Sequence, residues 1–279
     1  MEILISDDGS TDGSAELIRR YAGRDGRIRW WTNPRNLGIG GNWNACLEAA
    51  RADLIKYVFQ DDKLLGPSVL RRMATVLNED PSLSLVACAS QRIDAGSRLL
   101  RVRNRLGDSG VWDGKEIILR CLDSAENLIG EPSAVLFRKA QAARGFDARM
   151  VQMLDLEMWL HLLEQGRLAH IAEPLCAFRE HPGQQTVTNE GTGVTVRESL
   201  MLAEGYFARP WLKEVARPRQ LFGFMYTLRK RYGAQAAAAR AVIRRNMSTP
   251  TYARCWLQYK ISRPFQHLWR WLRKRGQSG

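Results

Sequence analysis

Short apolar runs alternate with stretches of helical periodicity along the first two thirds of the chain. Runs long enough for buried strands occupy residues 2–6, 27–32, 54–59, 83–90, 134–137 and 170–178. Apolar residues at helical spacing lie between them, over residues 14–21, 42–50, 68–77, 115–122 and 154–163. Strands that alternate with helices in this way predict an α/β fold, in which a mostly parallel sheet is flanked by helices.

Two stretches break this alternation. Residues 92–113 are polar and weakly patterned, so we expect a hairpin or a loop there. The Thr- and Gly-rich stretch 187–194 precedes a basic segment of helical pattern that begins near Val196. We therefore predict an α/β domain over residues 1–190 and a helical, basic C-terminal region over residues 191–279.

The formal net charge of +13 indicates an anionic partner. Nucleic acid, a phosphorylated small molecule and an acidic membrane surface all fit the charge alone. The five cysteines are scattered and form no CxxC pair, which argues against a zinc ribbon and favours free thiols in a reducing cytoplasm. Since no apolar run approaches the roughly 20 residues of a spanning helix, we expect any membrane contact to be peripheral, on the inner face of the membrane.

The end of the chain combines aromatic and basic residues. Apolar residues recur there at helical spacing, and Lys and Arg residues are interleaved with them from Arg254 to Arg275. A segment of this kind suits the interface of an anionic bilayer. The alternative is a terminal helix that packs on the main domain and exposes its basic face to water.

Two pairs of acidic residues follow predicted strands, Asp7-Asp8 and Asp61-Asp62. The carboxyl ends of the strands of an open α/β sheet are where ligands bind. Carboxylates there repel a phosphorylated substrate unless a divalent cation lies between them, and Mg²⁺ or Mn²⁺ prefers such oxygen ligands. One carboxylate can instead accept hydrogen bonds from a ribose hydroxyl or a base N–H. For Asp7-Asp8 a plain turn with a helix cap is the alternative.

The motifs resemble those of family-2 glycosyltransferases, in the same order along the chain. Residues 2–14, EILISDDGSTDGS, closely resemble the second strand and acidic turn of that family. Residues 36–44 resemble its loop and the start of the next helix, and residues 53–62 resemble its metal-binding strand. Residues 145–160 resemble the segment that holds the catalytic base, and residues 174–181 resemble the closing strand with its histidine.

This resemblance implies a GT-A-like (Rossmann-like) fold and an inverting transfer of a sugar from a nucleoside diphosphate, with UDP the commonest donor nucleotide. On the donor side it implies that Asp8 holds the nucleotide base and that Asp7 supports the turn. It also implies that Asn36 and Gly38 belong to a loop that contacts the same substrate. Asp61 is implied to lie near the ribose or the sugar.

The resemblance also assigns a metal and a base. It implies that Asp62 binds the Mg²⁺ or Mn²⁺ ion that bridges the diphosphate and that His181 reaches the metal or the phosphates; a surface histidine is the alternative. Asp155 is implied to be the general base that deprotonates a hydroxyl of a glycan or lipid-linked acceptor, in the synthesis of a surface polysaccharide. The alternative for Asp155 is a helix N-cap.

The sequence departs from the family pattern at two places. Position 60 is Gln where the family has an acidic residue, and two acids remain after it. The family also begins with a strand and a helix before the strand at residues 2–6, and we expect their absence to leave an exposed sheet edge.

Three other functions make different demands on the sequence. One alternative is a truncated, non-catalytic nucleotide-binding remnant, which the missing strand suggests. A nucleic-acid-binding protein fits the charge, but the charge lies largely in the tail and both candidate clefts are acidic, so we expect no nucleic acid partner. A nucleotidyltransferase would carry a Gly-rich, Arg- or Lys-bearing loop after its first strand, and this sequence shows none.

Overall fold

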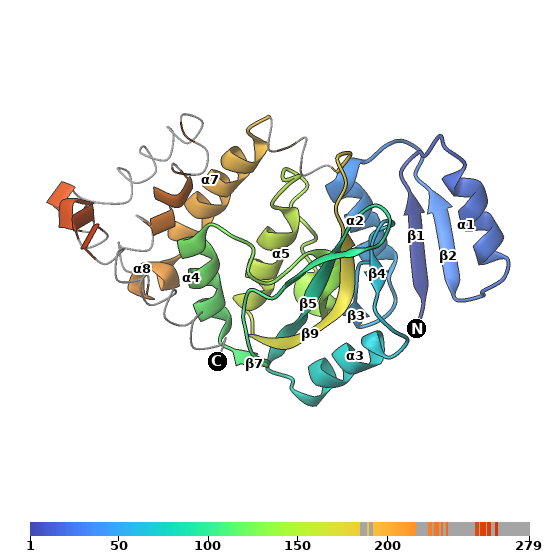
Figure 1. The fold of residues 1–279 in the computed structure, drawn as a ribbon, viewed down its shortest axis with the longest axis horizontal. Helices are drawn as coiled ribbons and strands as arrows, with labels where there is room; N and C mark the ends of the chain where they lie inside the picture. The colour runs from blue at the N-terminus through green and yellow to red at the C-terminus, as the bar shows by residue number, and fades with distance from the viewer. Residues whose placement is uncertain are drawn as a thin grey trace. The chain divides into compact units, whose positions relative to one another are not determined.

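The computed structural model describes residues 1–184, 189 and 192–215, and single positions and short runs between 223 and 261. The chain divides into two compact units. The first comprises Met1–Ile118 and Asn127–Gly191, and the second comprises Leu119–Glu126 and Thr192–Gly279. All the predicted site residues belong to the first unit, which holds both sheets (Figure 1).

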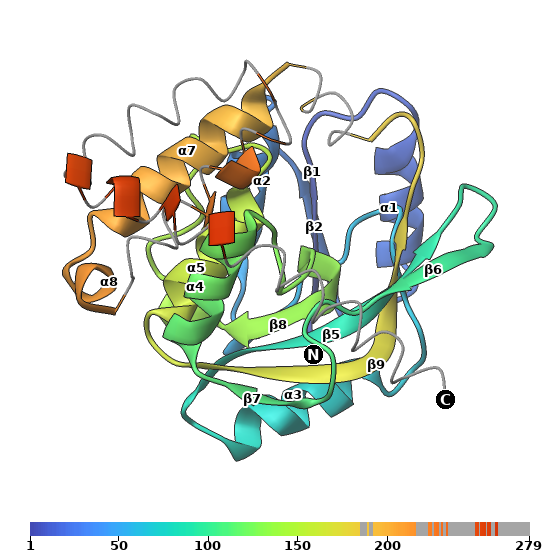
Figure 2. The same cartoon turned by 60° about the vertical axis from the view of Figure 1, so that its left-hand side comes forward.

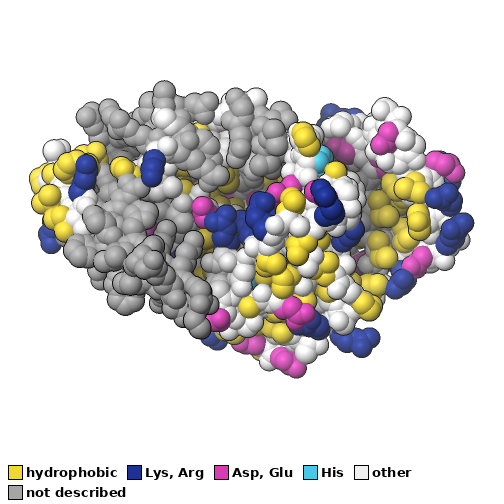
Figure 3. Space-filling model, in the orientation of Figure 1, with side chains coloured by type: hydrophobic (Ala, Val, Ile, Leu, Met, Phe, Trp, Pro, Cys, Tyr) yellow, Lys and Arg dark blue, Asp and Glu magenta, His cyan; other side chains and the backbone are white. Residues whose placement is uncertain are grey.

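The chain begins with a small parallel sheet. Strand β1 (Ile3–Asp7) pairs in parallel with β2 (Ile28–Thr32), and helix α1 (Ser14–Ala22) connects them. Among the described residues β1 pairs with no strand other than β2. None of the residues of helix α1 is buried. Its hydrophobic side chains lie at the surface, next to basic ones (Figure 3).

The main sheet has the strand order β3-β8-β5-β9-β4, with β6 on β5 and β7 on β9. Its strands are β3 (Leu54–Ile55), β4 (Lys63–Leu64), β5 (Leu83–Ile93), β6 (Leu99–Arg103), β7 (Gly110–Trp112), β8 (Val135–Arg138) and β9 (Arg167–Arg179). Only β5 and β9 run parallel to each other in this sheet as described. In Figure 2, β6 lies beside one end of β5 and β7 lies beside β9.

The α/β class and the flanking helices are confirmed, whereas the prediction of a mostly parallel sheet is wrong. The sheet is mixed because β4, β6, β7 and β8 enter it antiparallel to their neighbours. The chain that supplies β6 and β7 is the polar excursion over residues 92–113, which returns to the sheet through short turns instead of the long helical crossovers that parallel pairing requires.

The helices of the first unit are α2 (Gly38–Ala49), α3 (Val69–Glu79) and α5 (Leu154–Leu163), with 3₁₀ turns at Pro132–Ala134 and Lys139–Ala142. Helix α4 (Gly114–Ser124) is divided between the two units. The second unit contains α7 (Val194–Phe207) and α8 (Pro210–Val215).

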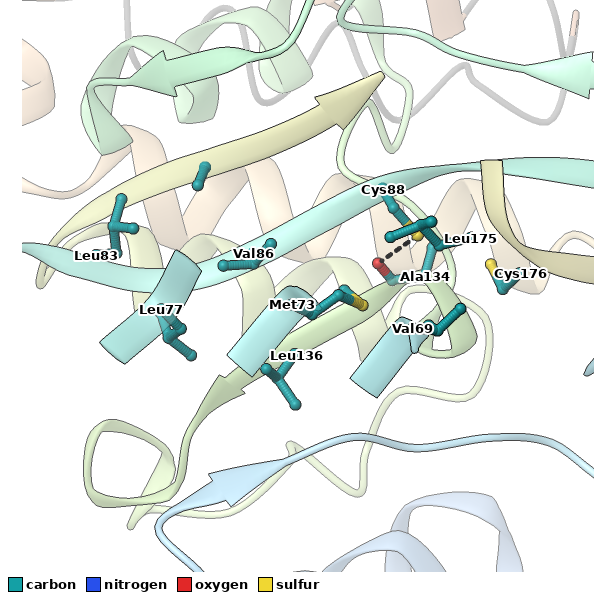
Figure 4. Packing of buried hydrophobic residues seen from close by; sticks show 11 residues of the cluster. Val69, Met73, Leu77, Leu83, Val86, Cys88, Ala134, Leu136, Leu175 and Cys176 are labelled. Atoms are coloured by element: carbon teal, nitrogen blue, oxygen red, sulfur yellow. Dashed lines mark hydrogen bonds between the residues drawn. The ribbon is translucent and has the colours of Figure 1, made fainter. Parts of the chain in front are cut away.

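One face of α3 packs on the main sheet (Figure 4). Val69, Met73 and Leu77 recur every four residues, so they line one side of the helix and are buried against β5, β8 and β9. The thiol of Cys88 on β5 donates a hydrogen bond to the carbonyl of Ala134, 3.4 Å away. The described cysteines are free, as the sequence predicts. This core fixes the strands whose ends carry the candidate site.

The predicted strand over residues 54–59 is shorter than expected and ends at Ile55. Beyond it, Tyr57 and Phe59 pack on Trp43 of α2, with ring centroids 5.6 and 5.1 Å from the Trp43 ring. The Tyr57 hydroxyl donates to the Trp43 carbonyl at 2.7 Å. These aromatic contacts, which the periodicity does not reveal, hold the segment that leads into Asp61 and Asp62.

No described helix is long and apolar enough to span a membrane. The amphipathic pattern of the tail falls largely outside the described residues, because positions 262–279 are not described. Within the described positions, the Lys260 ammonium lies 5.0 Å from the centre of the Trp256 ring, an example of the basic and aromatic pairing in this segment.

Candidate active site

The first acidic turn closes on itself at the carboxyl end of β1. Asp7 is buried, and its Oδ1 accepts a hydrogen bond from the Ser10 N–H at 3.1 Å. Its backbone carbonyl accepts one from the Asn33 N–H at 2.8 Å. Gly9 supplies the left-handed conformation that the turn needs, with φ of 90°. The contacts of Asp7 therefore shape the turn.

Asp8 joins this turn to the loop before α2. Its Oδ1 accepts hydrogen bonds from Asn33 Nδ2 and from the Leu37 N–H, both at 2.8 Å. The Asn36 side chain donates to the Asp8 carbonyl at 3.0 Å and accepts from the Gly38 N–H at 2.9 Å. The structure thus brings Asp7, Asp8, Asn36 and Gly38 together. Asp8 Oδ2 receives no hydrogen bond from the described residues, so it is available to a ligand N–H or hydroxyl.

Asn33 is the hub of this half of the site, and the sequence did not single it out. Its Nδ2 donates to Asp8 and to Asn42 Oδ1, the latter at 2.9 Å. Its Oδ1 accepts from Trp31 Nε1 at 3.0 Å and from the Ser6 hydroxyl at 3.3 Å. The signal available was its position, because it directly follows β2 at the same sheet edge as Asp8.

The second acidic turn precedes β4. Asp62 Oδ1 accepts a hydrogen bond from the Arg179 N–H at 3.2 Å, whereas the buried Asp62 Oδ2 has no partner. Desolvation raises the pKa of Asp62, and the Ser133 side chain opposes that rise. His181 Nε2 lies 3.3 Å from Asp61 Oδ2. The structure therefore gathers Asp61, Asp62 and His181 at one place.

Arg179, at the end of β9, holds this second turn in place and is a further residue that the sequence did not single out. Its Nε donates to the Asp61 carbonyl at 3.0 Å. Its Nη1 donates to the carbonyls of Asp94 and Ala95, both at 2.9 Å, and to the Ser97 hydroxyl at 3.0 Å. One guanidinium thus ties the acidic turn to the turn after β5.

The residues of the second turn fit a divalent cation in part. The described residues contain no group of three or more His, Cys, Asp or Glu side chains arranged to hold a metal ion. Asp62 Oδ2 is nevertheless a buried acceptor without a hydrogen bond, which a bound cation would satisfy, although the charges of Arg92 and Lys56 already act on this carboxyl group. Mg²⁺ is commonly held by one or two carboxylates together with substrate phosphates and waters. Asp62, with Asp61 and His181 beside it, fits a cation of this kind.

Asp155 lies in the first turn of α5. The helix has Met153 at its N-cap, so Asp155 is not the capping residue. Its Oδ1 accepts from the Leu156 N–H at 2.6 Å, and its Oδ2 accepts from Asn127 Nδ2 at 3.1 Å. Burial raises the pKa of Asp155 to about 6, against the lowering effects of these hydrogen bonds and of the Arg103 charge. A carboxylate of this pKa is suited to accept a proton near neutral pH.

A largely buried ionic network joins the loop at residues 127–133 to strands β5 and β6. Glu131 Oε1 is paired with the guanidinium groups of both Arg92 and Arg103. Arg92 also stacks on Phe178, with its guanidinium carbon 4.2 Å from the ring centre, and burial lowers its pKa to about 10. No role was predicted for this loop from the sequence.

The site residues form three local groups. The first surrounds Asp8, the second surrounds Asp62 and the third surrounds Asp155. No hydrogen bond among the described residues joins one of these carboxylates directly to another. The loop over residues 127–133 lies beside two of the groups, because Asn127 contacts Asp155 and the Ser133 side chain affects Asp62.

Comparison with known proteins identifies the chain. Residues 1–140 match the family described as Glycosyl transferase family 2. An uncharacterized protein of Mycobacterium tuberculosis is 32% identical over 197 residues, which cover 66% of this chain and 60% of that protein. The chondroitin synthase of Escherichia coli is 26% identical over 211 residues, 72% of this chain and 28% of the synthase. The chain thus spans less than two thirds of the length of either relative.

Solved structures share the fold at low sequence identity. Residues 1–349 of S. aureus TarS superpose with a TM-score of 0.54 at 15% identity, covering 88% of this chain and 79% of that one. The mannosyltransferase PcManGT of Pyrobaculum calidifontis, solved in complex with GDP-Man and Mn²⁺, gives a TM-score of 0.53 at 17% identity and covers 96% of this chain and 73% of that one. The chain has the GT-A fold and belongs to glycosyl transferase family 2.

Proposed function

We propose that this glycosyltransferase moves a sugar from a nucleoside-diphosphate sugar to a hydroxyl of a glycan or lipid-linked acceptor, with inversion and with a divalent metal. The observation that carries the proposal is the second acidic turn, in which Asp62 Oδ2 is buried without a hydrogen bond and the adjacent Asp61 contacts His181. Chondroitin synthase and hyaluronan synthase are among the relatives, which supports a role in the synthesis of a surface polysaccharide.

The first two groups of residues suit the donor. Asp8 offers a free carboxylate oxygen to a base N–H, and Asp7 maintains the turn from which Asp8 extends. Asn36 and Gly38 form the adjoining loop. UDP is our first choice of nucleotide because TarS has been crystallised with UDP, although PcManGT holds GDP-Man.

On the metal side, Asp62 and His181 would hold Mn²⁺ or Mg²⁺, and Asp61 would lie near the ribose or the sugar. A bound cation supplies positive charge that stabilises the leaving nucleoside diphosphate. Arg179 keeps the acidic turn in position through its bonds to Asp61 and Asp62.

Asp155 takes the proton of the acceptor hydroxyl. The acceptor oxygen then forms its bond to the anomeric carbon as the bond from that carbon to the diphosphate breaks, and attack from the opposite face inverts the configuration. Because its pKa is about 6, Asp155 is ionised and able to accept a proton above that pH. We also propose that the basic C-terminal region brings the enzyme to an anionic membrane surface where lipid-linked acceptors lie.

The donor site is tested by calorimetry of UDP, dTDP and GDP with and without Mn²⁺. We expect manganese-dependent binding of one nucleotide, and we expect Asp62→Ala to weaken it by more than about 100-fold, since outer-shell groups alone contribute about 10- to 100-fold. Asp25→Ala is the matched control, because Asp25 pairs with Arg27 through a 2.6 Å bond away from the site.

The result of this calorimetry distinguishes an active transferase from a non-catalytic remnant. Binding that is lost in Asp62→Ala and kept in Asp25→Ala supports the transferase site. Absence of binding to all three nucleotides would contradict it and favour the non-catalytic remnant. Binding that does not depend on Mn²⁺ would remove the metal from the proposal and leave the donor site.

A further inference from the structure

The side chain of Asn127 has every hydrogen-bonding position occupied. Its Oδ1 accepts from the Ile129 N–H at 3.1 Å and from the Gly130 N–H at 3.0 Å. Its Nδ2 donates to the Gly130 carbonyl at 3.0 Å and to Asp155 Oδ2 at 3.1 Å. A side-chain amide has two donors and two acceptor positions, so all four are used. The two accepted backbone bonds therefore fix which end of the amide faces Asp155.

The backbone of Asn127 is held as well as its side chain. Arg103 Nη2 donates to the Asn127 carbonyl at 2.8 Å, and the same guanidinium is paired with Glu131. From the other side, Trp159 Nε1 donates to the Gly130 carbonyl at 3.0 Å. Trp159 is fully buried and lies on α5, the helix that carries Asp155. Loop and helix are thus linked at two points, and one of these is Asp155.

We propose that Asn127 is a positioning residue for Asp155: it holds the carboxylate in one orientation and favours its ionised form, so that the base is ready for the acceptor hydroxyl. This inference rests on the proposed function of Asp155. A hydrogen bond donated to a carboxylate stabilises the charged state, and an amide fixed in this orientation always presents its donor.

Few charged groups near Asp155 affect its ionisation. Arg103 of β6 contributes a positive charge that favours the ionised form. Glu131 is neutralised by its two arginines. Glu157, two residues further along α5, is paired with Arg144 at 2.7 Å. The hydrogen bond from Asn127 is a direct contact of a neutral side chain with the Asp155 carboxylate, so it can be removed by substitution without removing a charge.

A second asparagine provides a matched control. Asn44 accepts from the Phe146 N–H at 2.7 Å and donates to the Phe146 carbonyl at 2.9 Å. It holds a loop in the same manner as Asn127, but these side-chain hydrogen bonds do not involve a carboxylate. Substitutions of Asn44 and Asn127 should both disturb a loop, and only those of Asn127 should alter the titration of Asp155.

The titration can be measured without any transferase assay. The free energy of unfolding in urea is determined from pH 4 to pH 9 for the wild type and Asp155→Asn. Asp155 has a folded pKa of about 6, above the roughly 3.9 of an unfolded aspartate, so its ionisation destabilises the fold as pH rises. The difference in the free energy of unfolding between the wild type and Asp155→Asn therefore changes with pH up to the folded pKa of Asp155 and is constant above it. The pH at which this difference becomes constant, here called the levelling pH, reports that pKa.

The same pair is then measured in the Asn127→Asp and Asn127→Leu backgrounds. Asn127→Asp can keep both accepted backbone bonds and places a second carboxylate against Asp155, whereas Asn127→Leu removes the donor. We expect the levelling pH to rise by about one unit or more in both, because a bond to a charged group is worth about one to two pH units. If one of these Asn127 variants does not fold, the other still gives the levelling pH. Asn127→Ser can be used in place of either variant.

An unchanged levelling pH, or an equal rise in Asn44→Leu, would overturn the inference. Kinetics distinguish this failure from failure of the proposed function. A shifted titration together with unchanged transferase activity at pH 6 to 7 would leave Asn127 as the positioning residue and remove Asp155 as the base. A shifted titration with a matching shift in the acid limb of kcat/KM supports both.

Discussion

Asp155→Asn is expected to lower kcat by about 10³-fold, within the 10²- to 10⁴-fold range of general acid–base catalysis, while nucleotide binding stays at the wild-type value. The amide keeps the shape of the side chain and cannot accept the proton of the acceptor hydroxyl. Calorimetry with UDP and Mn²⁺, followed by transfer kinetics with the donor so identified, measures the two quantities separately.

The pH dependence of kcat tests the role of Asp155 a second time. The wild type should lose kcat as pH falls through about 6, because protonated Asp155 cannot act as a base. The residual activity of Asp155→Asn should lack this limb. Asp147→Asn is the control: Asp147 lies in the same family-like segment, but its carboxylate is held by Arg149 at 2.6 Å, which lowers its pKa.

Two results would contradict the role of Asp155. One is a variant whose kcat stays within a few-fold of the wild type, and the other is an acid limb that persists in Asp155→Asn. An equal loss of activity in Asp147→Asn would show that the segment as a whole, and not this carboxylate, is required.

Periodicity predicted the elements that are stabilised by one apolar face or one buried run. Helix α5 was predicted over residues 154–163 and has these bounds, because its apolar residues follow helical spacing. Strand direction was beyond such reasoning. β8 and β4 run antiparallel to their neighbours through contacts between residues far apart in the sequence, such as Leu64 with Cys176. A local pattern carries no information about these contacts.

Only part of the candidate site could be predicted from the sequence. Acidic residues after strands could be found because the ends of strands meet at a sheet edge, and the order of motifs supplied their implied roles. The residues that hold them could not. Arg179 is 117 positions from Asp62, and Asn127 is 28 positions from Asp155. Nothing in the residue type distinguishes Asn127 from Asn44, whose hydrogen bonds are similar and whose neighbour is not an acid.

Glu131→Ala is expected to reduce the free energy of unfolding by about 3–5 kcal/mol, the usual cost of removing one partner from a buried ion pair. The side chain of Glu131 is 16% exposed and that of Arg92 only 6%, so water cannot replace the lost carboxylate at Arg92. The change also leaves Arg103 without this partner. Urea unfolding at pH 7 measures the loss.

The exposed pair of Arg72 with Glu173 serves as the control, with side chains 41% and 59% exposed. Glu173→Ala should cost no more than about 1 kcal/mol, because water screens surface pairs. A cost of the same size for Glu131→Ala would show that the network is solvated.

Replacing Arg92 by Met together with Glu131 by Leu should cost less than Glu131→Ala alone, because one fewer buried charge is left unpaired. Since Arg103 also binds the Asn127 carbonyl, a loss of transferase activity in this double variant at normal stability would show that the network matters for the geometry around Asp155 as well as for folding.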